Sequence, residues 1–167
     1  MEQNFRVNFR AKIISAGELS AWRQEMRKQS RKLVATNGCF DILHLGHVTY
    51  LETARHQGDA LIVGLNSDAS VRGLKGAGRP VNSQDDRAAV IAALASVDRV
   101  FVFSEREATG FLSLVQPDIY VKGGDYTIET INQDERHLVE RAGGRIVIVP
   151  IVKGKSTTAL LERISSL

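Results

Sequence analysis

The sequence has one cysteine and no long apolar run, and each of these absences excludes a class of protein. Cys39 stands alone among 167 residues, so an intrachain disulfide and a zinc cluster built on thiolates are both excluded. We expect Cys39 to be a buried small hydrophobe; a nucleophilic role is the less favoured alternative. No apolar run reaches the ~20 residues that a membrane-spanning helix needs, and the first residues lack the apolar segment of a secretory signal. We therefore expect a cytoplasmic protein with no membrane partner.

An excess of charge of one sign is also missing. The formal net charge is only +3, and lysines and arginines are spread along the chain in short, glycine-containing stretches. Nucleic-acid-binding domains usually gather basic residues into a strong patch. The pattern here favours a small anionic ligand, and no nucleic-acid partner is expected. With 43% hydrophobic and 25% charged residues, the composition is typical of a globular domain with a proper core.

Apolar strands and amphipathic helices are predicted to alternate along the chain. An N-terminal helix is expected at residues 16–32, where Leu19, Trp22 and Met26 have helical spacing. Strands are then predicted at residues 32–40, 59–68, 98–104, 117–125 and 145–152, and helices at 46–58, 83–97, 107–116, 132–144 and 156–167. Ser83 and Ser156 are suitable N-caps for two of these helices.

The strands are rich in Val, Ile and Leu on both faces, which is typical of a parallel sheet covered by helices. We predict an α/β fold: a Rossmann-like, doubly wound, five-stranded parallel sheet with helices on both faces. In the helix at 46–58, Val48, Leu51 and Ala54 are expected to face inward, and Gly58 to end the helix. Ligands of such folds bind beyond the carboxyl ends of the strands. The candidate site therefore lies in the loops at residues 36–47, 66–79, 104–106, 122–126 and 153–158.

The first of these loops contains His44 and His47, two of only four histidines in the chain. Gly38 allows close approach of a ligand to the backbone, and Gly46 and His47 open a predicted helix whose free N–H groups attract anions. Imidazole donors on either side of that helix start can stabilise charge on a transferring phosphoryl group. Two alternatives stay open: metal binding, with Asp41 as a third ligand, and a structural role for both histidines.

The second loop carries Arg72, Lys75 and Arg79 among three glycines. We interpret it as a mobile flap that brings cations to phosphates, although an ordinary surface loop would have a similar composition. Asp68, at the start of this loop, could bind a hydroxyl group or cap the following turn.

The last two loops also suit a nucleotide. Paired glycines followed by Asp125 allow close approach of a base or ribose, with a plain turn as the alternative. The stretch "KGKSTT" puts two lysines and three hydroxyl groups at a helix N-terminus. This arrangement is similar to a phosphate cradle without being a Walker motif; capping would explain Ser156 alone.

The sequence His44-Leu45-Gly46-His47 matches the HxGH signature of the cytidylyltransferase-like nucleotidyltransferases. Longer stretches, among them "NSDASVRGLKG" and "VKGGDY", are more specific. They resemble the D-glycero-β-D-manno-heptose 1-phosphate adenylyltransferases, which make ADP-heptose for bacterial lipopolysaccharide. The similarity runs from about Lys12 to the C-terminus.

The resemblance implies that ATP and a sugar 1-phosphate react in line at the α-phosphorus and release pyrophosphate. No covalent intermediate forms, so Cys39 has no catalytic role. By the same resemblance, Mg²⁺ is expected to enter with ATP, no metal site in the protein is expected, and the protein is expected to be a homodimer. His44 and His47 are the implied catalytic residues. The implied nucleotide-binding residues are Asn37, Gly38, Cys39, Phe40, Gly46, Lys122, Gly123, Gly124, Asp125, Ser156, Thr157 and Thr158. Candidates for the sugar-phosphate side are Asp41, Asp68, Lys75, Arg79 and Arg87.

From the helical spacing at the N-terminus, residues 1–30 are expected to be a helical extension packed on a nucleotidyltransferase domain at 31–167. This would be a stand-alone form, whose substrate a separate kinase supplies. One departure is Ile151, which stands near the position where cytidylyltransferases acting on glycerol phosphate have an arginine. The alternatives are a cytidylyltransferase acting on glycerol 3-phosphate, an FAD synthetase, and a nucleotide-binding regulator that has lost catalysis. The presence of both histidines speaks against the regulator.

Overall fold

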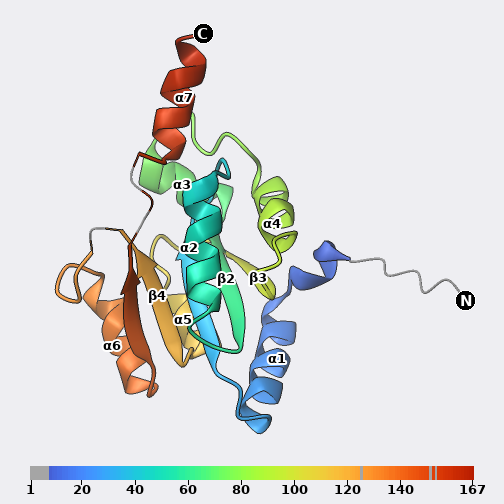
Figure 1. Ribbon diagram of the computed structural model, residues 1–167. Coiled ribbons are helices and arrows are strands. Elements are labelled where there is room, and N and C mark those ends of the chain that lie inside the picture. The colour runs from blue at the N-terminus through green and yellow to red at the C-terminus, as the bar shows by residue number, and fades with distance from the viewer. Residues whose placement is uncertain (1–7, 125, 151, 153) are drawn as a thin grey trace, which may run out of the picture.

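The computed structural model describes residues 8–124, 126–150, 152 and 154–167. Its five strands form one parallel sheet in the order β3-β2-β1-β4-β5 (Figure 1). The strands are β1 (Leu33–Gly38), β2 (Ala60–Asn66), β3 (Arg99–Phe103), β4 (Ile119–Gly123) and β5 (Arg145–Val149).

The helices cover both faces of this sheet, which confirms the predicted doubly wound α/β fold. They are η1 (Phe9–Lys12), α1 (Ala16–Lys28), α2 (Leu45–Arg55), α3 (Asp68–Lys75), α4 (Gln84–Ala92), α5 (Thr109–Val115), α6 (Gln133–Arg141) and α7 (Thr157–Ser165). Side chains of α2 and α4 share one apolar cluster with the sheet, and those of α1, α5 and α6 share the other. Helices α3 and α7 lie at the top of Figure 1, beyond the carboxyl ends of the strands. No helix in the described ranges is long and apolar enough to span a bilayer.

The strands are apolar throughout because both of their faces are buried. In β1, Val34 joins the cluster with α2 and α4, whereas its neighbours Leu33 and Ala35 join the cluster with α1, α5 and α6. Leu19 and Met26 of α1 are fully buried in that second cluster. The N-terminal helix therefore packs on the main body as predicted, while the domain boundary at residue 30 remains a prediction.

Two details of α2 differ from the prediction. Val48 is exposed, because the first turn of this helix extends beyond the carboxyl ends of the strands. The helix ends at Arg55, and Gly58 is needed for close packing instead: a Cβ there would lie 2.7 Å from Val34 Cγ2 and 2.9 Å from the Lys32 carbonyl oxygen. The N-caps Ser83 and Ser156 are confirmed, since each accepts a hydrogen bond from the third backbone N–H beyond it.

The predicted flap at residues 66–79 contains helix α3, which the sequence analysis took for a loop. Ser67 caps the helix by accepting from the Ser70 N–H, and Val71 anchors it in the core. Arg72 and Lys75 stand in its last turn, where cations interact favourably with the helix dipole. Only the connection after Lys75 is irregular.

The strand order creates a crevice. After β1 the chain moves through β2 to β3 at one edge, then crosses to β4 on the other side of β1 (Figure 1). The connections that leave β1 and β4 therefore diverge, and ligands of doubly wound sheets bind at this switch point.

Gly64 of β2 lets the ring of Phe111 lie against the sheet, and substitution there should be costly. A Cβ at position 64 would lie 2.7 Å from two ring carbons of Phe111, which is itself 1% exposed and cannot swing out. Overpacking of this kind costs about 1–3 kcal/mol. We expect Gly64→Ala to lower the urea midpoint accordingly. Gly17→Ala, where nothing lies within 4 Å, is the control, and equal midpoints for both variants would contradict this packing argument.

Candidate functional site

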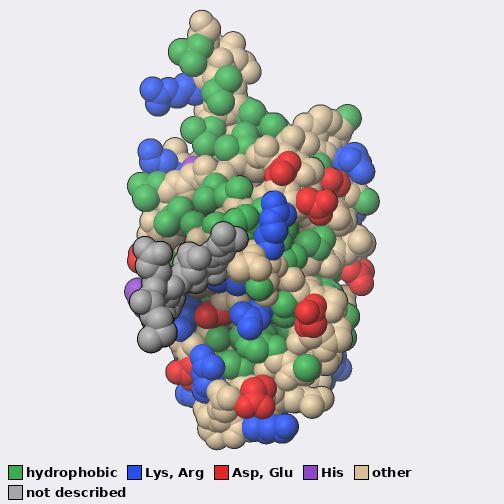
Figure 2. All heavy atoms as spheres, turned by 90° about the vertical axis from the view of Figure 1, so that its right-hand side faces the viewer, with side chains coloured by type: hydrophobic (Ala, Val, Ile, Leu, Met, Phe, Trp, Pro, Cys, Tyr) green, Lys and Arg blue, Asp and Glu red, His purple; other side chains and the backbone are tan. Residues whose placement is uncertain are grey.

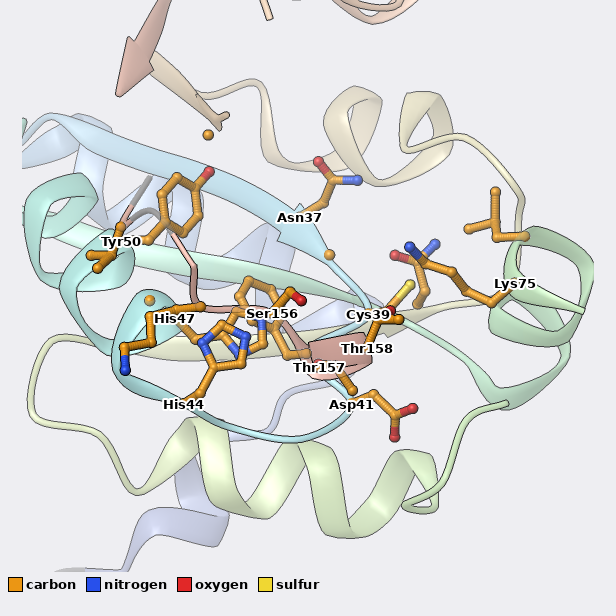
Figure 3. A pocket seen from close by; sticks show the side chains of 18 of the residues that line it. Asn37, Cys39, Asp41, His44, His47, Tyr50, Lys75, Ser156, Thr157 and Thr158 are labelled. Carbon is orange, nitrogen blue, oxygen red and sulfur yellow. The ribbon is translucent and has the colours of Figure 1, made fainter. Parts of the chain in front are cut away.

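A cavity of about 580 Å³ opens at the switch point (Figure 3). It is bounded by the loop after β1, the first turn of α2, the segment from α3 to Arg79, the end of β4 and the start of α7. Most of the predicted site residues, from four of the five predicted loops, line it: Asn37, Gly38, Cys39, Phe40, Asp41, His44, Gly46, His47, Lys75, Arg79, Lys122, Gly123, Ser156, Thr157 and Thr158.

Four predicted residues do not line the cavity or cannot be judged. Asp68 and Arg87 lie outside its lining, and so does Gly124, which adopts a φ of 114° after β4. Asp125 lies outside the described residues. The same is true of Ile151, the departure from the cytidylyltransferase pattern.

The cavity also includes residues that were not selected from the sequence: Tyr50, Asn66, Leu74, Tyr126, Val152 and Lys155. Tyr50 follows His47 by three residues, so helical spacing could have placed it on the same face. Lys155 belongs to the "KGKSTT" stretch whose lysines had no assigned role. Asn66, Leu74 and Tyr126 lie in loops predicted to border the site but were not singled out, and no motif marked Val152.

The two histidines form a stacked pair at the start of α2. His44 is the N-cap residue, and its side chain makes no capping hydrogen bond; His47 stands in the first turn. Their ring centroids are 3.8 Å apart, and Phe40 packs edge-on to His47 at 5.2 Å. In the described part of the chain, the buried Nδ1 atoms of both rings have no hydrogen-bond partner. Buried polar atoms rarely remain unpaired, and both histidines line the cavity, so the pair is a candidate for contact with a ligand.

A second helix N-terminus, that of α7, lines the same cavity as the histidines. A Cβ added at Gly46 would lie 3.0 Å from the His44 ring and 3.2 Å from Lys155 Cβ. Lys155 and His44 therefore both pack against this glycine. A Cβ at position 46 would require these neighbours to shift. The first turn of α2 and the start of α7 thus line one cavity together with Lys155. This combination favours an anion.

Both histidines are held neutral. Burial, together with the neighbouring His44, lowers the pKa of His47 to about 4. Burial and the charge of Lys155 also lower the pKa of His44. A neutral imidazole keeps one N–H donor and one acceptor nitrogen, and a bound phosphate would favour the protonated form.

This low pKa predicts a pH-dependent stability. The unfolded chain takes up a proton at His47 near pH 6.5, whereas the folded chain does so only near pH 4. Between these values the unfolded state binds more protons, so the free energy of unfolding should fall as pH falls from about 6.5 to about 4. His44 acts in the same direction. Asp41, whose pKa lies below its ordinary 3.8, stabilises the folded state at neutral pH. This stabilisation is lost as the pH falls below about that ordinary value.

Urea unfolding between pH 4 and 8 tests this expectation. His47→Gln should flatten the profile, while His137→Gln, at an exposed position on α6, should leave its shape unchanged. Parallel profiles for the wild type and His47→Gln would contradict the assignment.

Asp41 organises the connection that covers one side of the cavity. Its buried carboxylate pairs with Arg79 Nε at 2.7 Å and accepts from the N–H groups of Val81 and Asn82 at 2.9 and 3.0 Å. Burial acts to raise the pKa of Asp41, but the N–H groups of Asn82 and Val81 and the Arg79 guanidinium hold it below its ordinary value. Asp41 is thus engaged with protein groups. Within the described ranges, no three His, Cys, Asp or Glu side chains gather as metal ligands.

Arg87 was predicted to contact the substrate, and its position does not support direct contact. The side chain is fully buried, and its guanidinium donates to the carbonyl oxygens of Cys39 (2.6 Å), Asn66 (2.9 Å) and Asn82 (3.1 Å) and to Asp68 Oδ1 (2.8 Å). It therefore joins the ends of β1 and β2 to the segment before α4, beneath the cavity. Asp68 is occupied by the same ion pair, and the cap of α3 is Ser67.

Cys39 is half-buried and lines the cavity, so the expectation of a buried hydrophobe is only partly met. Burial raises the pKa of its thiol, which keeps it protonated at neutral pH and disfavours a nucleophilic role.

Comparisons with known proteins agree with this architecture. A family model described as cytidylyltransferase-like matches residues 35–166. Bifunctional protein HldE of Mesorhizobium japonicum is 53% identical over 150 residues, which are 90% of this chain and 29% of that protein. HldE of Pseudomonas fluorescens is 49% identical over 152 residues, which are 91% of this chain and 31% of that protein. The chain thus spans less than a third of the length of these curated relatives.

A solved structure gives a further match. The lipopolysaccharide core biosynthesis protein from Thermoplasma volcanium has a TM-score of 0.61 and 31% identity to this chain. The match covers 75% of this chain and 99% of that protein.

Proposed function

This chain belongs to the cytidylyltransferase-like family, and from that premise we propose that it is an adenylyltransferase. It joins ATP and D-glycero-D-manno-heptose 1-phosphate to give ADP-heptose and pyrophosphate, for the inner core of lipopolysaccharide. The observation that carries the proposal is the stacked pair of His44 and His47 between two helix N-termini, at the mouth of a switch-point cavity. The choice of ATP and heptose phosphate is supported by the stretches "NSDASVRGLKG" and "VKGGDY" and by the names of the HldE and lipopolysaccharide relatives.

In the proposed reaction, an oxygen of the sugar phosphate attacks the α-phosphorus of ATP. The bond from that phosphorus to the bridging oxygen of the β-phosphate breaks, and pyrophosphate leaves. His44 and His47 donate hydrogen bonds to phosphate oxygens and stabilise the charge that develops there. The N-termini of α2 and α7 and the charge of Lys155 border the same cavity and add to this stabilisation.

The remaining lining residues divide between the two substrates. The loop after β1, the end of β4 and the start of α7 are proposed to hold the nucleotide. Lys75, on the side of the cavity away from the histidines (Figure 3), and Arg79, which also lines the cavity, are proposed to bind the sugar phosphate. Asp41 is the one carboxylate among the described lining residues and is held by Arg79. We therefore assign no residue to Mg²⁺, which would enter bound to ATP.

The rest of the proposal concerns assembly and surroundings. We propose a cytoplasmic homodimer that acts on small molecules, without nucleic-acid or membrane partners. In support of a dimer, α7 projects from the body and carries apolar side chains (Figure 2), and its Ile164 is 60% exposed.

A panel of substrates tests this function. Pyrophosphate release is measured with Mg²⁺ and either ATP or CTP, against heptose 1-phosphates, glycerol 3-phosphate and flavin mononucleotide. We expect release only with ATP and a heptose 1-phosphate. Release with CTP and glycerol 3-phosphate would show a cytidylyltransferase instead, and release with ATP and flavin mononucleotide would show an FAD synthetase. Nucleotide binding without turnover on any acceptor would favour the regulator.

A further inference from the structure

The floor of the cavity holds a lysine whose charge is already used. Lys122, at the end of β4, places its Nζ 3.1 Å from Asn37 Oδ1, 2.9 Å from the hydroxyl of Tyr120 and 3.2 Å from Glu135 Oε2. An ammonium has three hydrogens and accepts nothing, so these three contacts occupy all of them. Glu135 also balances its charge, and both side chains are largely buried. A direct bond from Lys122 to a phosphate would have to break one of these contacts.

The same contacts fix the orientation of the Asn37 amide. The atom that faces the Lys122 ammonium must be an acceptor, which is Oδ1 and not Nδ2. The Tyr120 hydroxyl, at 2.6 Å, contacts the same oxygen. In the described part of the chain, Asn37 Nδ2 has no protein partner, while the residue lines the cavity (Figure 3). Asn37 therefore presents only N–H donors to a ligand.

The group that holds this orientation is itself firmly anchored. Glu135 on α6 is 3% exposed, and its other oxygen accepts from the Ala108 N–H at 2.9 Å, where α5 begins. The single hydroxyl hydrogen of Tyr120 lies between Asn37 Oδ1 and Glu135 Oε2, at 2.6 and 2.9 Å. Tyr120 is completely buried. Four segments thus converge to hold one carboxamide at the switch point.

We propose that the N–H groups of the Asn37 amide donate to a phosphate oxygen of the ligand in the cavity. Lys122, Tyr120 and Glu135 are positioning residues that hold this amide in its orientation. A phosphate oxygen is an acceptor only, which matches a group that offers only donors. The inference rests on the proposed function, and the phosphate is that of ATP or of the sugar phosphate. It reassigns Lys122 from direct nucleotide contact to support of Asn37.

Asn37→Asp is the sharpest test, because it keeps the shape and the oxygen that Lys122 needs but replaces the donors by a carboxylate oxygen. Loss of a hydrogen bond to a charged group predicts a roughly 10- to 100-fold increase in KM for the substrate that carries the phosphate. The melting temperature should stay close to that of the wild type. A rise in the KM for ATP alone assigns the contact to the nucleotide, and a rise in the KM for heptose 1-phosphate alone assigns it to the sugar phosphate. An unchanged KM for both would overturn the proposal.

The positioning role is tested by combining variants. Glu135→Gln alone should raise the same KM several-fold but add nothing in the Asn37→Asp background, because it acts through Asn37. Additive effects would overturn the positioning role. If Glu135→Gln does not fold, Tyr120→Phe replaces it in the same cycle. Glu140→Gln, an exposed position on the same helix, is the matched control and should leave both KM values unchanged.

The binding of Mg-ATP and of heptose 1-phosphate, each measured alone by calorimetry, separates this inference from the proposed function. If the wild type binds a ligand without turning over, the proposed reaction fails. Weaker binding by Asn37→Asp would then still support the inference, and equal binding would overturn it. If the wild type binds neither ligand, both proposals fail.

Discussion

Replacing His44 or His47 by alanine should lower kcat for pyrophosphate release by roughly 10²- to 10⁴-fold. The two rings stack at the start of α2, and their buried Nδ1 atoms have no partner in the described ranges. Both rings line the cavity, where they could supply donors to the charge that develops on a transferring phosphoryl group. Because this charge is largest in the transition state, kcat should fall more than KM rises.

Two other histidines serve as controls for this experiment. His56 follows α2 and His137 lies on α6, and both are exposed. Their alanine variants should keep wild-type kcat. Circular dichroism and thermal melts must find His44→Ala and His47→Ala folded. Full activity of either variant would show that the mechanism is wrong.

Arg87→Ala is expected to cause the largest loss of stability, about 3–5 kcal/mol. Four acceptors, three of them main-chain carbonyls, depend on this one buried guanidinium. Its removal leaves carbonyl groups unpaired in the interior, each of which is costly. For a chain of this length the melting temperature should fall by roughly 10 °C. Arg87→Lys should be almost as harmful, because an ammonium has three donors and lacks the planar fork.

Arg72→Ala is the matched control, since Arg72 is exposed in the last turn of α3. Its free energy of unfolding should stay within about 0.5 kcal/mol of wild type. The opposite result would be a wild-type melting temperature for Arg87→Ala together with a raised KM for the sugar phosphate. That result would restore the direct substrate contact that the sequence suggested and contradict the structural role described above.

The fold was predictable because its strands are buried on both faces and so form continuous apolar runs between amphipathic helices. Two helices, η1 and α3, were not predicted; α3 is short and contains Gly73. Its stability comes from the Ser67 cap and from burial of Val71, and burial is decided by the rest of the fold. Val48 was predicted to face inward because periodicity cannot show where the sheet ends.

The site was predictable where one segment carries its chemistry. His44, Gly46 and His47 are close in sequence, and a helix start after a strand fixes their place. Arg87 was predicted to contact the substrate because a charged residue near a loop resembles a ligand contact. Its acceptors are carbonyl groups from three separate segments, which no local pattern reveals. The engagement of Lys122 by Asn37 and Glu135 likewise exists only after β1, β4 and α6 come together.

The most direct test of the central claim is to follow the label from ATP that carries ³²P at the α- or the γ-position, in the presence of Mg²⁺ and heptose 1-phosphate. The account predicts that the α-label enters the nucleotide-sugar and that the γ-label leaves only in pyrophosphate. Transfer of the γ-label to the sugar, or its release as inorganic phosphate, would mean attack at another phosphorus and would contradict adenylyl transfer at this site.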